Sequence, residues 1–267
     1  MSMKKFLKIS IISIIAILML AACGSKEDKK TASNDGLKTI KDRDKIVFGV
    51  KNDTRLFGLK NPKTGEVEGF DIDISKALAK EILGDDKKVE FKEVTSKTRV
   101  PLLQNGKIDA VVATMTITEE RKKEVDFTDV YFEAGQSLLV KKGSKIKSID
   151  DLKAGTKVIA VKGSTSAVNV HEKAPDAQVL QFENYAEAFT ALKSGQGDAL
   201  TTDDAILYGM ADENPDYELV GGQFTEEPYG IAVKKGNKEL VDELNKALKT
   251  IKDNGTYDEI KSKWIKK

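Results

Sequence analysis

Two short stretches of the chain, LQNGKIDAV (103–111) and LKSGQGDAL (192–200), follow one pattern. Both read Leu-x-x-Gly-x-x-Asp-Ala followed by an apolar residue. This pattern is typical of a helix that ends near a glycine, a tight turn and the first residues of a buried strand. Two separate copies predict two lobes of similar construction, and the alternative is a chance likeness between two helix–strand loops.

Strand-like and helical patterns alternate around these stretches. The segment 73–84 places Ile74, Leu78 and Ile82 at four-residue spacing and ends at Gly84, as a helix with a glycine cap would. Such alternation predicts an α/β fold in which each lobe is a mostly parallel sheet flanked by helices. An apolar stripe on the C-terminal helix is expected to pack on a lobe. The strand-like runs lie at 45–50, 89–94, 109–114 and 156–161.

The N-terminus has the pattern of a secretory signal. Lysines precede an apolar run from Ile9 to Ala22, which is short for a membrane span. The sequence Leu20-Ala-Ala-Cys23 resembles the lipobox of bacterial lipoproteins, which implies a signal peptide over 1–22 and a lipidated Cys23. Polar residues then predict a flexible tether over 23–40. A plain signal peptide with an incidental cysteine is the alternative.

Charge and residue usage exclude several classes of function. Removal of residues 1–22 takes away three lysines and no acidic residue, leaving 41 basic and 43 acidic residues. This balance argues against nucleic acid as a partner. His171 is the one histidine, and no Ser-His-Asp set, cysteine nucleophile, metal cluster or phosphate loop is found. We therefore expect no catalytic residue, no cofactor and no metal. Asp71 and Asp73 fit a strand end and helix start better than a metal pair.

Binding chemistry is easier to identify than catalysis. Arg121 follows the Thr-rich end of a strand and the helix cap Thr118, and its guanidinium could hold a carboxylate through two hydrogen bonds. The run KGSTSA (162–167) could offer backbone N–H groups to an anion. Asp203, at another strand end, could hold an ammonium group. The alternatives are a solvated charge for Arg121 and a helix cap for Asp203.

From about Lys41 to Lys267 the chain resembles the family 3 solute-binding proteins of polar amino-acid ABC transporters. The resemblance implies two α/β lobes joined by two hinge strands, with hinges near 131–136 and 225–229 and a ligand held where the lobes close. The first lobe would comprise 41–132 and 228–267, and the second 137–224. The segments that carry the resemblance are GFDIDI (69–74), TMTITEERKKEVDF (114–127), VIAVKGSTSA (158–167) and NGTYDEIKSKW (254–264).

The resemblance also implies a role for individual residues. Arg121 would bind the α-carboxylate of an amino acid, with the backbone of Thr116 and of Thr165 or Ser166. Asp203 would bind the α-ammonium, with Thr114 or Thr116 as acceptors.

The pocket for the ligand side chain is expected at VTSKTRVPLL (94–103), which resembles the acidic-amino-acid and glutamine branch of the family. Lys51, Ser96 and Arg99 would lie there. Thr54 and Ser96 stand where well-known glutamine binders carry phenylalanine, and two cations favour a γ-carboxylate. The sequence therefore favours glutamate, with glutamine close behind and aspartate as a further possibility.

The sequence thus predicts a monomeric receptor on the outer face of the membrane of a Gram-positive bacterium. It would be anchored by lipid and would deliver glutamate or glutamine to an ABC permease. Two alternatives remain open at this point: a dehydratase-like enzyme on the same fold, and a surface adhesin as a second role.

Overall fold

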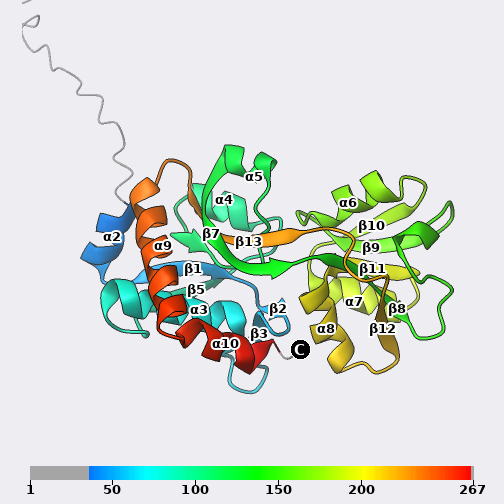
Figure 1. Cartoon of the computed structure of the whole chain (residues 1–267), viewed down its shortest axis with the longest axis horizontal. Helices are drawn as coiled ribbons and strands as arrows, with labels where there is room; N and C mark the ends of the chain where they lie inside the picture. The colour runs from blue at the N-terminus through cyan, green and yellow to red at the C-terminus, as the bar shows by residue number, and fades with distance from the viewer. Residues whose placement is uncertain (1–35, 266–267) are drawn as a thin grey trace, which may run out of the picture. The chain divides into compact units, whose positions relative to one another are not determined.

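The computed structural model describes residues 36–265 of the chain. Their helices and strands form two α/β lobes, each built on a five-stranded sheet (Figure 1). The sheet of the first lobe has the order β5-β1-β6-β13-β7, and that of the second lobe has the order β10-β9-β11-β8-β12. A small sheet, β2-β3-β4, packs against helix α3 of the first lobe. The predicted α/β fold with two lobes is confirmed.

The first-lobe sheet consists of β1 (Ile46–Val50), β5 (Val89–Glu93), β6 (Ala110–Val111), β7 (Val125–Ala134) and β13 (Glu227–Lys234). The second-lobe sheet consists of β8 (Gln136–Lys141), β9 (Lys157–Val161), β10 (Gln178–Phe182), β11 (Ala199–Asp203) and β12 (Tyr217–Val220). The small sheet consists of β2 (Asp53–Thr54), β3 (Gly58–Lys60) and β4 (Val67–Glu68). The helices of the first lobe are α2 (Gly36–Arg43), α3 (Phe70–Leu83), α4 (Arg99–Gln104), α5 (Glu119–Glu124), α9 (Lys238–Asp253) and α10 (Thr256–Trp264). Those of the second lobe are η1 (Ile149–Asp151), α6 (Ser166–Lys173), α7 (Tyr185–Lys193) and α8 (Asp204–Asp212).

Each large sheet mixes parallel and antiparallel strands. In the first lobe β5, β1 and β6 are parallel, whereas β13 runs antiparallel to β6 and β7. In the second lobe β10, β9 and β11 are parallel, whereas β8 runs antiparallel to β11 and β12. The antiparallel strands flank the two places where the chain passes between the lobes. Strand–helix–strand patterns in the sequence predict parallel pairs only, so they described the parallel part of each sheet.

The repeated sequence pattern has one structural role in both lobes. The backbone N–H of Val47 donates to the Asp109 carboxylate at 2.7 Å, and the N–H of Asp109 donates back to the Val47 carbonyl at 2.8 Å. Lys157 and Asp198 exchange the same two bonds, at 2.8 Å each. In each lobe the aspartate therefore fixes the start of the neighbouring parallel strand. The two stretches have similar sequences because they form the same pair of hydrogen bonds.

The N-terminal helix α2 covers part of the segment that the sequence predicted as tether. Residues 36–43 form a helix that packs on α9 and whose Ile40 is fully buried, so the predicted tether over 23–40 is too long at its C-terminal end. The signal peptide over 1–22, the lipidated Cys23 and tether residues 23–35 lie outside the described residues.

Among residues 36–265, no helix is both long enough and apolar enough to span a bilayer.

The C-terminal helices pack on the first lobe, as the apolar stripe predicted. Leu240, Leu244 and Ile251 of α9 are buried against α3 and β7. The Trp264 indole of α10 donates to Asp73 at 2.7 Å. Asp71 instead faces the interior and accepts from Tyr131. The two aspartates thus have separate structural partners, and the described residues contain no cluster with metal-ligand composition.

The chain crosses between the lobes at two places, where β7 passes into β8 and where β12 passes into β13 (Figure 1). The first crossing is Gly135 and the second is the segment 221–226. A Cβ atom on Gly135 would lie 2.4 Å from the Thr225 carbonyl oxygen. The two crossings therefore touch backbone to backbone, and hinge motion there stays a prediction.

Truncation of a buried α9 side chain should destabilise the first lobe. Leu244→Ala leaves a cavity at a site with 0% exposure, so we expect the free energy of unfolding to fall by about 2–5 kcal/mol. Urea unfolding followed by circular dichroism measures this change. The exposed control Lys246→Ala should change stability by less than about 0.5 kcal/mol. Equal effects of the two variants would contradict the packing of α9.

Candidate ligand-binding site

A small polar cavity lies between the two lobes. The space between its lining atoms is about 190 Å³, including the solvent at its open side. Its walls come from the end of β11 and from the segments that follow β5, β6, β9 and β10. The carboxyl ends of strands are where open α/β sheets bind ligands. The lining residues are Ser96, Arg99, Thr114, Thr116 and Arg121 from the first lobe, and Ser164, Thr165, Ser166, Tyr185, Thr202 and Asp203 from the second.

Arg121 reaches from the first lobe to the second. It lies on α5, whose cap Thr118 accepts from the Arg121 N–H at 3.2 Å, as predicted. Its Nη1 donates to the Thr116 carbonyl at 2.7 Å and its Nη2 to the Gly163 carbonyl at 3.1 Å. No carboxylate of the described residues lies within ion-pair distance of this guanidinium. Burial lowers the pKa of Arg121, and an anion in the cavity would stabilise its charge.

Arg99 is buried beside the cavity, with 2% of its surface exposed. Its Nη1 donates to the carbonyl oxygens of Ala113 at 2.7 Å and Thr114 at 3.2 Å, and its Nε has no partner among the described residues. Burial, followed by the charge of Arg121, lowers the pKa of Arg99 to about 9. Arg99 is therefore a buried side chain and does not lie on the surface.

Lys51 lies behind Ser96 and outside the cavity lining. Its Nζ donates to the Ser96 hydroxyl at 2.8 Å and lies 5.0 Å from the centre of the Tyr185 ring. Burial and the charge of Arg99 lower the pKa of Lys51 to about 7, and the charges of Asp53 and Asp71 oppose this shift. A fully buried amine with a hydroxyl partner can change its charge near neutral pH.

Asp203 stands at the end of β11, opposite Arg121. It occupies the cap position of α8, but its side chain makes no capping hydrogen bond, so the helix-cap interpretation does not explain it. Tyr229 of β13 donates to its Oδ2, and its Oδ1 has no partner among the described residues. Burial and the charge of Glu227 raise the pKa of Asp203 to about 7, while Tyr229 and Arg121 lower it.

Several buried polar atoms around the cavity lack a partner within residues 36–265. A buried unpaired donor or acceptor costs free energy, so a molecule with complementary groups would be held firmly there. The atoms in lining residues are Arg99 Nε, Thr114 Oγ1, Ser166 Oγ and Asp203 Oδ1.

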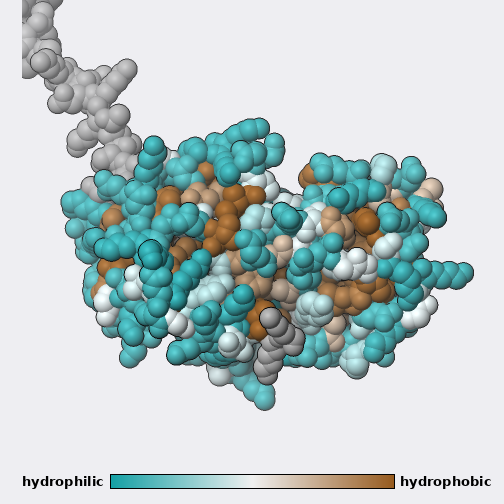
Figure 2. Space-filling model, in the orientation of Figure 1, coloured by the Kyte–Doolittle hydropathy of each residue, from teal (hydrophilic) through white to brown (hydrophobic). Residues whose placement is uncertain are grey.

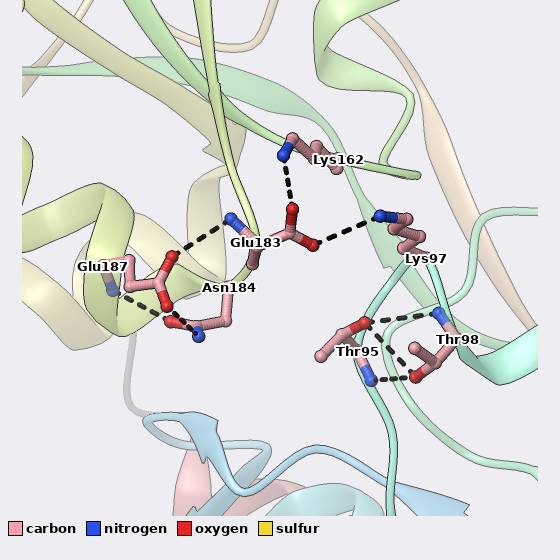
Figure 3. Close-up of polar contacts among 7 residues, drawn as sticks. All are labelled: Thr95, Lys97, Thr98, Lys162, Glu183, Asn184 and Glu187. Atoms are coloured by element: carbon pink, nitrogen blue, oxygen red, sulfur yellow. Dashed lines mark hydrogen bonds and ion pairs between the residues drawn. The ribbon is translucent and has the colours of Figure 1, made fainter.

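Polar contacts, here called the rim contacts, join the lobes next in sequence to the lining residues Ser96 and Tyr185 (Figure 3). Glu183 of the second lobe interacts with Lys162 of its own lobe and lies 3.5 Å from the Lys97 ammonium of the first lobe. Asn184 caps α7, and the next N–H, that of Tyr185, donates to Asp53 of the first lobe at 2.7 Å. Hydrophilic side chains also cover most of the face seen in Figure 2. The rim contacts hold the two walls together.

Most of the residues singled out from the sequence meet at this cavity. Eight of the nine line it, and Lys51 contacts one of them. Sequence reasoning missed Tyr185, Ser164 and Thr202 in the lining and Glu227 behind it. Ser164 lies within the KGSTSA run, so that run already contained a signal for it. Thr202 directly precedes Asp203 at the end of β11, so that strand end already contained a signal for it. No local pattern marks Tyr185 or Glu227, because distant segments bring them to the site.

The fold and this cavity define a protein that binds a small polar molecule between two lobes. Residues 46–267 match the model of the bacterial extracellular solute-binding proteins, family 3, and the chain belongs to this family.

Similar proteins agree with this assignment. The chain is 71% identical over 268 residues to the ABC transporter glutamine-binding protein GlnH of Bacillus subtilis (strain 168), covering 99% of this chain and 98% of that one. It is 58% identical over 246 residues to a glutamine-binding protein of Geobacillus stearothermophilus, covering 88% and 94%. A solved structure described as an ancestral arginine-binding protein bound to glutamine superposes with a TM-score of 0.78 at 50% identity, covering 83% and 97%.

The titration of Asp203 offers a direct test of the site geometry. We expect its carboxyl group to titrate near pH 7 in the free protein, because burial and Glu227 raise its pKa. Tyr229→Phe removes a donor that favours the carboxylate, so the midpoint should move higher. Carbon-13 NMR measures both midpoints, and Asp203→Asn assigns the signal. A midpoint near pH 4, or a downward shift in Tyr229→Phe, would contradict this arrangement.

Proposed function

We propose that this chain captures an amino acid outside the cell and delivers it to an ABC permease. Glutamine is the principal ligand and glutamate the second. The observation that carries the proposal is the pairing of Arg121, which has no ion-pair partner among the described residues, with the unpaired Oδ1 of Asp203 in one cavity. These groups complement the two ends of a zwitterion. The names of the two most similar relatives support glutamine.

Each predicted binding residue has a role in this proposal. Arg121 and the backbone of Thr116, Thr165 and Ser166 hold the α-carboxylate. Asp203 and the oxygens of Thr114 and Thr116 hold the α-ammonium. Ser96, Arg99 and Lys51 form the side-chain end, where the Arg99 Nε can donate to an amide or carboxylate oxygen.

The ligand acts by favouring the closed arrangement of the lobes. Arg121 and Asp203 belong to different lobes, so a zwitterion that contacts both binds more tightly when the lobes are together. The rim contacts Lys97–Glu183 and Asp53–Tyr185 add to the same arrangement. The chain performs no bond chemistry in this proposal, in keeping with relatives that are solute-binding proteins. The monomeric state and the Gram-positive membrane stay predictions of the sequence.

Titration calorimetry tests the ligand. We expect glutamine to bind, and Arg121→Gln to weaken binding about 100-fold or more because two charge-assisted hydrogen bonds are lost. The matched surface control Lys123→Gln, which has a largely exposed side chain, should bind as the wild type does. Absence of binding to glutamine and glutamate alike would overturn the proposal.

The same titrations separate glutamine from glutamate. Lys51, whose pKa is about 7, is a cation below neutral pH and a neutral amine above it. The affinity ratio of glutamate to glutamine should therefore fall as the pH rises through 7. Asp203 acts equally on both ligands and cancels from the ratio. In Lys51→Met the ratio should not change with pH, and an unchanged pH dependence would remove Lys51 from the side-chain end.

We further propose that Cys23 is lipidated and anchors the protein to the outer face of the membrane. The motif Leu20-Ala-Ala-Cys23 at the end of the apolar run supports this proposal. Cys23→Ser should move the protein from the membrane fraction to the culture medium, as measured by immunoblotting of fractionated cells. The control Ser25→Ala should remain with the membrane. Retention of Cys23→Ser on the membrane would contradict lipid anchoring.

A further inference from the structure

A buried carboxylate lies directly behind the candidate site. Glu227, at the start of β13, has 2% of its surface exposed. Its Oε2 accepts from the hydroxyls of Thr116 at 2.6 Å and Thr165 at 2.8 Å. Its Oε1 accepts from the Asn169 amide at 2.8 Å and the Thr225 hydroxyl at 3.1 Å. Four donors thus converge on one carboxylate, and two of them belong to residues that line the cavity.

These bonds fix which way two hydroxyl groups point. A carboxylate can only accept, so Thr116 and Thr165 must donate their hydrogens to Glu227. Thr165 also accepts from the Gln136 side-chain amide at 2.8 Å, which is consistent with the same direction. A hydroxyl has a single hydrogen to donate. The Thr116 oxygen is therefore left with lone pairs for the cavity, and it can act there only as an acceptor.

We propose that Glu227 is a positioning residue that makes Thr116 an acceptor for the ligand ammonium. It thereby selects ligands that are cationic at this end. The inference rests on the proposed function and deepens it. Glu227 contacts no ligand in this role, because Thr116 and Thr165 lie between it and the cavity.

The charge of Glu227 also favours a cation at this end of the cavity. Its field favours the charged form of Arg121 and raises the pKa of Asp203. Asp203 and Glu227 together place two carboxylates near one end of the cavity, and a cation there offsets their mutual repulsion. A ligand ammonium supplies this charge, whereas a neutral group at the same position does not.

A purely structural role makes a different prediction from a positioning role. Glu227 lies at the crossing between the lobes and bonds to Thr116 of the first lobe and to Asn169 of the second. If it only held the lobes together, its removal would weaken all ligands equally. If it orients Thr116, its removal weakens ligands that carry an ammonium more than ligands that lack one.

Glu227→Met tests the proposal, because methionine is of similar length and is at most a weak acceptor. The two probes are glutamine and its des-amino analogue glutaramate, with affinities measured by calorimetry and competition. In Glu227→Met we expect the affinity for glutamine to fall by a factor about tenfold or more larger than the factor by which the affinity for glutaramate falls. Glu227→Gln, which keeps one accepting oxygen, should fall between the wild type and Glu227→Met. The exposed neighbour Glu226→Met is the matched control and should bind as the wild type does.

A mutant cycle with glutamine alone gives a second measurement. In the Thr116→Val background, Glu227→Met should cost little further affinity, because the oxygen that it orients is absent. Thr116→Ser keeps the hydroxyl and should restore the full effect of Glu227→Met. The Asp203 midpoint should also fall in Glu227→Gln, since a charge that raises it is removed.

The outcomes distinguish this inference from the proposed function. Equal losses for glutamine and glutaramate would overturn the positioning role, as would an undiminished effect of Glu227→Met in Thr116→Val. If Glu227→Met does not fold, Thr116→Val alone decides, because equal losses of both probes would show that Thr116 is no acceptor for an ammonium. A wild-type protein that binds no glutamine would instead overturn the proposed function.

Discussion

Basic side chains that are buried between the two lobes need polar partners in place of water, and this requirement determines the arrangement of residues around the cavity. Lys51, Arg99 and Arg121 lie close together without an ion-pair partner among the described residues. Backbone carbonyls and a serine hydroxyl hold them in place, and these groups are neutral. The three basic groups are therefore oriented but not paired with an anion, a condition that suits the capture of an anionic group.

The same requirement explains the residues around the cavity. Strand ends supply short hydroxyl side chains, and the carbonyls that follow β6 point at guanidinium groups. Thr114 has a positive φ of 46°, a conformation that is uncommon for residues other than glycine. The Asp71 carboxylate accepts from its N–H at 3.1 Å and from Tyr131 at 2.9 Å, and so supports this conformation from behind. Rigid support of this kind keeps the binding groups at fixed positions.

Much of this could be predicted from the sequence, for physical reasons. Short sequence patterns mark the ends of helices, as they do at the caps Thr118 and Asn184 and at the turn glycines. Helices and strands could therefore be predicted from such patterns. The repeated Asp109 and Asp198 stretches indicated two lobes because the same strand-start bond needs the same residues in each. Arg121 and Asp203 were found because strand ends are where sheets bind ligands.

The remainder depends on contacts between distant segments, which no local pattern encodes. Glu227 and Tyr229 reach the site from a strand that crosses between the lobes, and Tyr185 reaches it from a helix start. The antiparallel half of each sheet was missed for the same reason. Burial of Arg99 also needed the fold, since nothing in its neighbourhood distinguishes it from a surface arginine.

The close approach of Gly135 to the Thr225 carbonyl has a mechanical consequence. Where two backbones touch, neither can move nearer to the other. We therefore predict that the contact acts as a pivot, about which the lobes would swing while the distance between their bases stays the same. A larger residue in place of Gly135 would change the direction in which the lobes approach each other. The two walls of the cavity would then fit together differently, although none of their own residues had changed.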